Sequence, residues 1–156
     1  MHHIEYRKAA ARHLTTCQHL LKDIKDQKAD KKNKLLLNIY YLSGYVIETA
    51  LSYAFFSHIK HTGHVEECTY YKEGFKTHTF DVKVQYILKV NGDLSSLPFV
   101  RQQLPDRKLN LLYKSWKTDF RYCYNDQLRE SDLTEDLIYK YLYNIEIFLE
   151  TILKRF

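Results

Sequence analysis

The first candidate for a functional residue is Glu48, a carboxylate in the middle of an apolar stretch. Residues 35–59 carry a single formal charge, and that charge is Glu48. Burying a carboxylate in an apolar helix is costly unless a cation or several hydrogen-bond donors meet it. We therefore expect a basic residue from another part of the chain to lie beside Glu48.

Arg121 is the basic residue that best fits this role. It lies within residues 116–126, WKTDFRYCYND, where aromatic and apolar residues surround it. A guanidinium can bind a carboxylate through two parallel hydrogen bonds. On the helix of Glu48, spacings of three and four residues place polar side chains on one face: Tyr41, Tyr45, Glu48 and Ser52. The alternative is that Arg121 and Glu48 form a buried structural pair without chemistry.

A second group of residues has side chains that can bind a metal. Histidines recur between residues 58 and 78, with an acid and a thiol near them: His58, His61, His64, His78, Glu67 and Cys68. Cysteine and histidine are preferred ligands of zinc. However, Gly63 interrupts the helical spacing, and the segment contains neither a CxxC nor an HxxxH motif. We therefore expect no metal and no cofactor, and histidines in a solvated loop. His2 and His3, at the start of the chain, are not counted as ligands.

Basic residues form two groups that differ in their surroundings. In the first, residues 22–34, lysines alternate with aspartates, which favours a solvated helix face. The second is interleaved with aromatic residues: Arg101, Arg107, Lys108, Lys114 and Lys117, with Tyr113, Trp116 and Tyr122. Such a set could hold RNA through phosphate contacts and base stacking, and the alternative is again a solvated face. The net charge of +5 allows a polyanionic partner but does not require one.

The composition favours a single all-α domain over residues 1–156. The chain contains only 4 Gly and 2 Pro, so helix breakers are scarce. Apolar spacing predicts helices over residues 4–28, 35–59, 80–90 and 106–116, and a last helix capped by Ser131. Residues 26–34 are predicted to form a polar hinge, and residues 61–79 an irregular insertion loop.

The pattern also bears on location. Residues 35–59 are long enough to span a bilayer, but a glutamate at the midpoint is expensive in lipid, which favours a buried core helix. The 3 cysteines are far apart and include no CxxC pair, which is typical of a reducing compartment. Residues 1–12 lack the apolar core of a signal peptide. We expect a cytoplasmic protein without a membrane segment.

Two segments resemble a known family. Residues 41–51, YLSGYVIETAL, resemble the GY-x-x-E-x-x-L second helix of HEPN domains. Residues 116–122, WKTDFRY, are similar to the W…RY segment before the final helix of these domains. A weaker match joins His78 and Asp81, followed by Leu88, to the H-D-L opening of their third helix. Together the matches follow the family order along the whole chain.

The resemblance implies an up-down bundle of four to five helices that is usually a homodimer. It also implies an RNA-binding or RNA-processing role in a bacterial toxin–antitoxin or defence system. The resemblance carries over Arg121 and its acidic partner Glu48 as catalytic residues. We add Asp126 as a candidate catalytic residue, and Asn125, Tyr122, Tyr45 and Lys117 as candidate RNA-binding residues. The alternative is a non-catalytic interaction module that partners a nucleotidyltransferase or another helical protein.

The chain departs from the family pattern at one position that matters for catalysis. Ribonuclease members carry a histidine a few residues after the arginine, whereas this chain has Asp126, Gln127 and Leu128 there. A histidine can act as a general acid or base near neutral pH, and an aspartate at its ordinary pKa is a poor general acid. Whether the protein is an enzyme is therefore left open by the sequence.

Overall fold

The computed structural model describes residues 1–90, 99–100, 104, 106–121 and 132–156. Every regular element in these ranges is helical, which confirms the predicted all-α bundle. The α-helices are α1 (Ile4–Asp23), α2 (Ala29–His58), α3 (Phe80–Val90), α4 (Arg107–Ser115) and α5 (Glu135–Arg155). The shorter elements are η1 (Val65–Glu67) and η4 (Thr118–Arg121), which are 3-10 helices, and η2 (Tyr71–Phe75), which is a π-helix.

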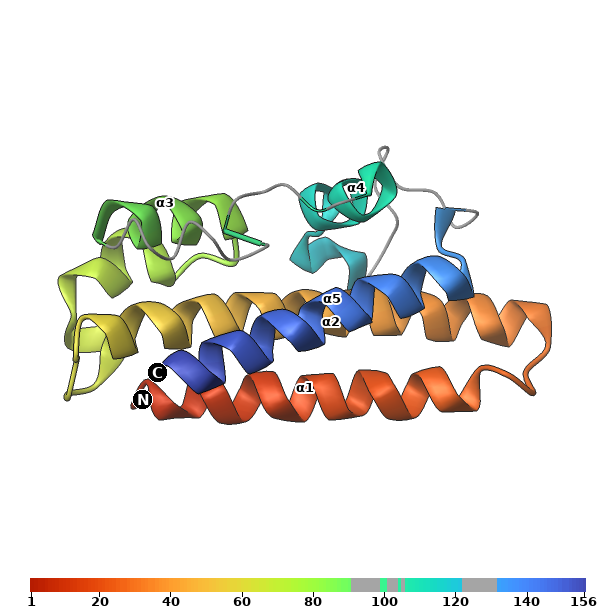
Figure 1. The fold of residues 1–156 in the computed structure, drawn as a ribbon, viewed down its shortest axis with the longest axis horizontal. Helices are drawn as coiled ribbons and strands as arrows, with labels where there is room; N and C mark the ends of the chain where they lie inside the picture. Colours follow the sequence, from red (N-terminus) through yellow and green to blue (C-terminus); the bar gives the residue numbers. More distant parts are fainter. Residues whose placement is uncertain (91–98, 101–103, 105, 122–131) are drawn as a thin grey trace.

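Three long helices form the body of the molecule. In Figure 1, α1 and α2 lie side by side along the long axis, and α5 crosses in front of α2. The shorter helices α3 and α4 lie along the edge of α2 that is opposite α1, and both chain termini lie at the same end. The segments that carry the candidate residues therefore meet on α2.

The central helix α2 is buried on nearly all sides in its second half. Every residue from Val46 to Phe56 is buried, as expected for a helix that is apolar all round. Among the described residues, no helix combines the length and the apolar character needed to cross a membrane. Glu48 lies within this buried part, so its carboxylate must be satisfied inside the fold.

Two predicted helix boundaries were wrong at the first hinge. The first helix ends at Asp23 and the second begins at Ala29, so the hinge is shorter than residues 26–34. The charged residues at the start of α2 stabilise the helix through ion pairs and do not interrupt it. Lys34 pairs with Asp30 at 2.9 Å one turn away, and Lys32 reaches Glu135 on α5 at 2.6 Å.

The helices near the end of the chain give one confirmation and one correction. Residues 106–116 were predicted to be helical, and α4 begins there with Asp106 as its cap, whose carboxylate accepts from the amide of Lys108 at 2.6 Å. The last helix begins at Glu135, and the Thr134 hydroxyl caps it by accepting from the amide of Leu137 at 3.3 Å. The predicted cap was therefore wrong, and Ser131 lies outside the described residues.

Residues 61–79 are more ordered than an irregular loop. They contain η1 and η2, and both Val65 and Phe75 are buried. The Phe75 ring stacks on Phe55 of α2 with 4.3 Å between centroids. Aromatic contacts with α2 thus fix a segment that lacks a helical period. Its last residues lead into α3, which spans Phe80–Val90 as predicted.

Candidate functional site

Glu48 is bound by two basic residues from the region before and within α3. One carboxylate oxygen lies 2.9 Å from Nδ1 of His78, and the other lies 3.6 Å from Nζ of Lys83. Both partners differ from the predicted one. Arg121 ends η4, and its side chain lies outside the described part of the chain, so its pairing with Glu48 stays a prediction.

Lys83 is fully buried, and its ammonium contacts a carboxylate, a backbone carbonyl and an aromatic ring. Nζ donates to the backbone carbonyl of Phe75 at 2.9 Å and lies 5.0 Å from the centroid of the Phe75 ring. Burial lowers the pKa of Lys83, and the nearby Glu48 carboxylate acts in the opposite direction. The ion pair with Glu48 is therefore part of what keeps this lysine in the core.

His78 brings the cluster to the surface. Its side chain is 57% exposed, against 9% for Glu48 and 0% for Lys83. It contacts Tyr45 of α2 edge-on, with 6.0 Å between ring centroids. An ionised carboxylate only accepts hydrogen bonds, so the Glu48 contact assigns the proton of the neutral ring to Nδ1. Nε2 is then the ring nitrogen that can accept a proton from another group.

The two segments that carry the family resemblance are in contact. The indole Nε1 of Trp116 donates to the backbone carbonyl of Tyr41 at 3.0 Å, and the indole contacts the Tyr45 ring edge-on. The close approach depends on Gly44, since a Cβ there would overlap the indole. On its other side Trp116 stacks on Phe80, the first residue of α3, with 4.7 Å between centroids. Trp116 thus joins α2 to the start of α3.

A pocket of about 330 Å³ opens beside His78, between the start of α3 and the α4–η4 region. Charged side chains at its edge include Lys114 and Lys117, with Asp81 and Asp119 also in the lining. Trp116 contributes to the lining but is only 6% exposed. Its ring and that of Tyr113, which is 2% exposed, form the floor of the pocket and leave little ring surface exposed.

The structure brings together some of the predicted site residues. Tyr45 lies beside His78, and its hydroxyl is 2.9 Å from that of Tyr41, so the polar face of α2 is real. Lys117 lines the same pocket as His78. Three further predicted residues lie outside the described part of the chain: Tyr122, Asn125 and Asp126.

Sequence reasoning missed the contacts of His78 and Lys83 with Glu48. His78 was assigned to a solvated loop with the other histidines, although it also stood in the weak third-helix match. Lys83 had a clearer signal, because it shares the apolar face of α3 with Phe80, Val84 and Ile87. A lysine at that spacing must bury its ammonium and needs a carboxylate.

The other histidines of the segment have different neighbours. The Nε2 of His61 lies 3.0 Å from the carbonyl of His64, whose own Nδ1 lies 3.0 Å from the N-terminal amine. Within the described ranges, no group of three or more His, Cys, Asp or Glu side chains has the geometry to hold a metal ion.

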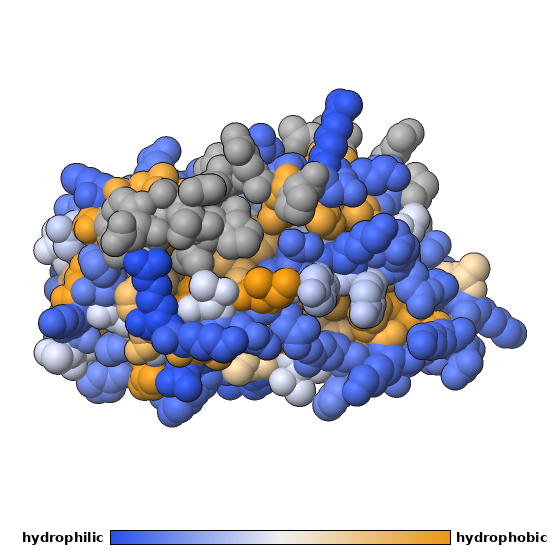
Figure 2. All heavy atoms as spheres, viewed as in Figure 1, coloured by the Kyte–Doolittle hydropathy of each residue, from blue (hydrophilic) through white to orange (hydrophobic). Residues whose placement is uncertain are grey.

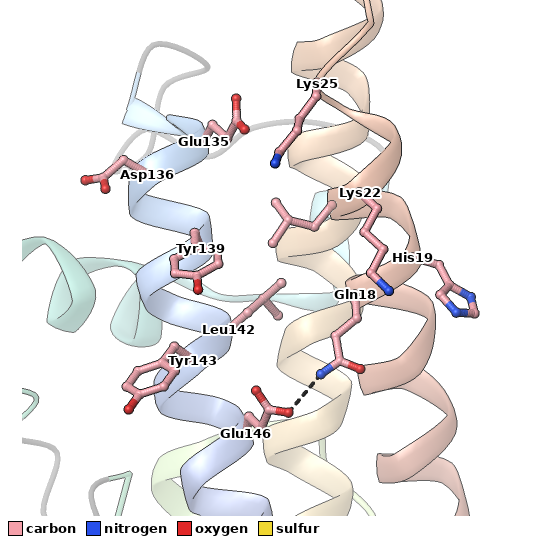
Figure 3. A pocket seen from close by; sticks show the side chains of 11 residues that line it. Gln18, His19, Lys22, Lys25, Glu135, Asp136, Tyr139, Leu142, Tyr143 and Glu146 are labelled. Atoms are coloured by element: carbon pink, nitrogen blue, oxygen red, sulfur yellow. Dashed lines mark hydrogen bonds between the residues drawn. The ribbon is translucent and has the colours of Figure 1, made fainter.

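A second pocket lies between α1 and α5. It has a volume of about 770 Å³, with lysines on its α1 wall and carboxylates on its α5 wall. Figure 3 shows Lys22 and Lys25 across the groove from Glu135 and Asp136, with Tyr139 and Tyr143 along the α5 side. It is not lined by Glu48 and shares no lining residue with the His78 pocket.

Comparison of the chain with protein-family models, with curated sequences and with solved structures finds no match.

Proposed function

We propose that the chain is an HEPN-like RNA-binding module, and that the pocket beside His78 is its contact site for RNA. The observation that supports this most is the position of His78. A buried carboxylate holds its Nδ1 at 2.9 Å while the ring is exposed at a pocket that also presents Lys114 and Lys117. The two lysines can offer positive charge and hydrogen-bond donors to a phosphate, and Nε2 of His78 can accept a hydrogen bond from a ribose hydroxyl.

The mixture of charges in this pocket favours a nucleotide over a simple anion. The lysine side chains suit phosphate oxygens, whereas the carboxylates of Asp81 and Asp119 would repel them. Carboxylates accept hydrogen bonds from the amino groups of bases. In this proposal a single strand lies across the pocket with a phosphate at the lysines and a base edge at the acids.

An RNA-processing activity at this site would use His78 as the group that transfers protons near neutral pH. Glu48 is too buried to touch RNA and acts as a positioning residue for the imidazole. Arg121 is a candidate catalytic residue by resemblance, and Asp126 is a further candidate at the position where the family has a histidine. We expect any cleavage of single-stranded RNA to be lost in both His78→Ala and Arg121→Ala proteins that stay folded. Cleavage by His78→Ala at the parent rate would rule out its role.

The binding proposal is tested by titrating a fluorescent single-stranded RNA and following its anisotropy at several salt concentrations. The double variant Lys114→Gln/Lys117→Gln should weaken binding and reduce the salt slope by about 1 per lysine. The matched control is Lys8→Gln/Lys89→Gln, which removes the same charge from exposed positions on α1 and α3. Equal losses in the two variants would mean that only net charge matters, and would contradict the pocket.

A second candidate function is the non-catalytic interaction module, with a nucleotidyltransferase or another helical protein as partner. The observation that favours it is the large groove between α1 and α5, which has tyrosines along one side and charged walls (Figure 3). A nucleotidyltransferase gene beside this one would support a toxin–antitoxin pair. Binding of that protein without any RNA affinity in the parent would favour this function over the first.

A further inference from the structure

The helix α5 carries large apolar side chains on its outer face as well as on its inner face. Tyr139, Tyr143 and Ile147 are 61%, 57% and 41% exposed, and their spacing of four residues puts them on one side. Ile145 and Ile152, on the other side, are fully buried in the core. Figure 2 shows apolar side chains exposed near the middle of the face that α5 crosses, among hydrophilic ones. Such a stripe is typical of a protein contact.

Charged residues at both ends of this stripe have an ordered pattern of signs. Asp136 and Lys140 form an ion pair of 2.7 Å near the start of the helix, and Glu150 and Lys154 form one of 3.4 Å near its end. Along the helix the four signs read minus, plus, minus, plus. A second copy running in the opposite direction reads plus, minus, plus, minus. The face is therefore complementary to itself in an antiparallel pair.

The positions of these residues fix one register. When a twofold axis passes at the level of Ile145, residues equally far before and after Ile145 face each other in the two copies. Lys140 then faces Glu150 of the second copy, and Asp136 faces Lys154 of the second copy. In the same register Tyr143 packs against Ile147 of the second copy, which places the apolar residues at the centre.

Neighbouring registers are disfavoured by the same charges. A shift of about one helical turn in one direction places Asp136 opposite Glu150 of the second copy. A shift in the other direction places Lys140 opposite Lys154 of the second copy. Like charges facing each other across an interface are unfavourable. Only the register centred on Ile145 combines opposite charges at both ends with apolar contacts between them.

We propose that this outer face of α5, from Asp136 to Lys154, binds the same face of a second copy in an antiparallel pair centred on Ile145. The face lies on a different helix from those that line the His78 pocket. The contact is isologous, so each favourable pair occurs twice. It goes beyond the proposed RNA-binding function and does not depend on it, since a dimer can form whether or not RNA binds.

The test uses two charge reversals, Lys140→Glu and Glu150→Lys, made in separate proteins. Each reversal places like charges opposite one another twice, so each should raise the dimer dissociation constant by about 10-fold or more, measured by sedimentation velocity. When the two variant proteins are mixed, both pairs again join opposite charges, and a mixed dimer of near-parent affinity should form. The control is Lys8→Glu, which reverses an exposed lysine paired with Glu5 on α1.

Circular dichroism of each variant shows whether the fold is intact, so loss of the dimer can be separated from loss of structure. A parent protein that is monomeric at its highest soluble concentration would overturn the proposal and leave the face to a different protein. A dimer that neither reversal weakens, or variants that do not pair when mixed, would also overturn it. RNA titration of the folded variants separates this result from that of the proposed function.

Discussion

The Nδ1 of His78 lies 2.9 Å from the carboxylate of Glu48, although the two residues are 30 positions apart in the sequence. Glu48 is buried in the central helix, whereas His78 is exposed at the start of α3. The buried carboxylate therefore fixes the orientation of the exposed His78 ring. Lys83 lies beside the other carboxylate oxygen, so both oxygens of Glu48 have a basic partner inside an apolar helix.

The buried pair of Glu48 and Lys83 should be strongly coupled in stability. Glu48→Leu or Lys83→Met alone leaves one charge without its partner, and each should lower the free energy of unfolding by about 3–5 kcal/mol. The double variant Glu48→Leu/Lys83→Met removes both charges and should lose less than the sum. Urea unfolding of all four proteins gives the coupling energy. Additive losses would show that the two charges do not depend on each other.

The contact between Gly44 and Trp116 predicts a steric effect. Gly44→Ala should reduce the free energy of unfolding by about 1–3 kcal/mol, because the added methyl group overlaps the indole. In a Trp116→Leu background the same change should cost much less. Gly63→Ala is the control, since a Cβ there would lie no closer than 3.3 Å to any side chain, with Glu67 at 3.3 Å and the His61 ring at 3.7 Å. Equal changes in the free energy of unfolding for Gly44→Ala and Gly63→Ala, measured in urea, would contradict the close packing of Trp116 on Gly44.

His13 predicts a dependence of stability on pH. Its ring lies 5.7 Å from that of Tyr45, and burial lowers its pKa from the ordinary 6.5, with the Arg12 charge acting in the same direction. Below pH 6.5 the unfolded chain therefore binds this proton more readily than the folded one, and stability falls as the pH decreases towards the lowered value. Above pH 6.5 the histidine is neutral in both states and this contribution stays constant.

The pH effect is measured by comparing the unfolding free energy of the parent and a His13→Gln variant between pH 5 and about 8. The difference between the two proteins should change below pH 6.5 and be constant above it. His19→Gln, at an exposed position of the same helix, serves as the control. A difference for His13→Gln that is constant across the whole range would contradict the burial of its neutral form.

Sequence patterns predicted the helices better than the contacts of the site. Local spacing was sufficient for Phe80–Val90 and for the helix that Asp106 begins, because caps and apolar periods are local signals. The end of the first helix at Asp23 and the start of the second at Ala29 were not predicted. The first turns of α2 carry Lys32, which reaches Glu135 on α5, a contact between distant parts of the chain that local spacing does not reveal.

The sequence predicted that Glu48 needs a basic partner, but it did not predict which residues supply one. The need of Glu48 for a cation follows from its apolar surroundings and could be predicted. The identity of the partners does not follow, because two basic side chains converge through the folding of residues 61–79 onto α2. That segment is ordered by aromatic contacts such as Phe75 with Phe55, which have no period in the sequence.

An NMR titration would show whether RNA binds at the pocket beside His78, as we propose. The chain has a single tryptophan, so the indole N–H of Trp116 gives one resonance at the floor of this pocket. On addition of a short single-stranded RNA, we predict that the resonances of the His78 ring and the Trp116 indole shift together and saturate at the same RNA concentration. RNA binding that shifts residues 22–34 and leaves both of these signals unchanged would contradict it.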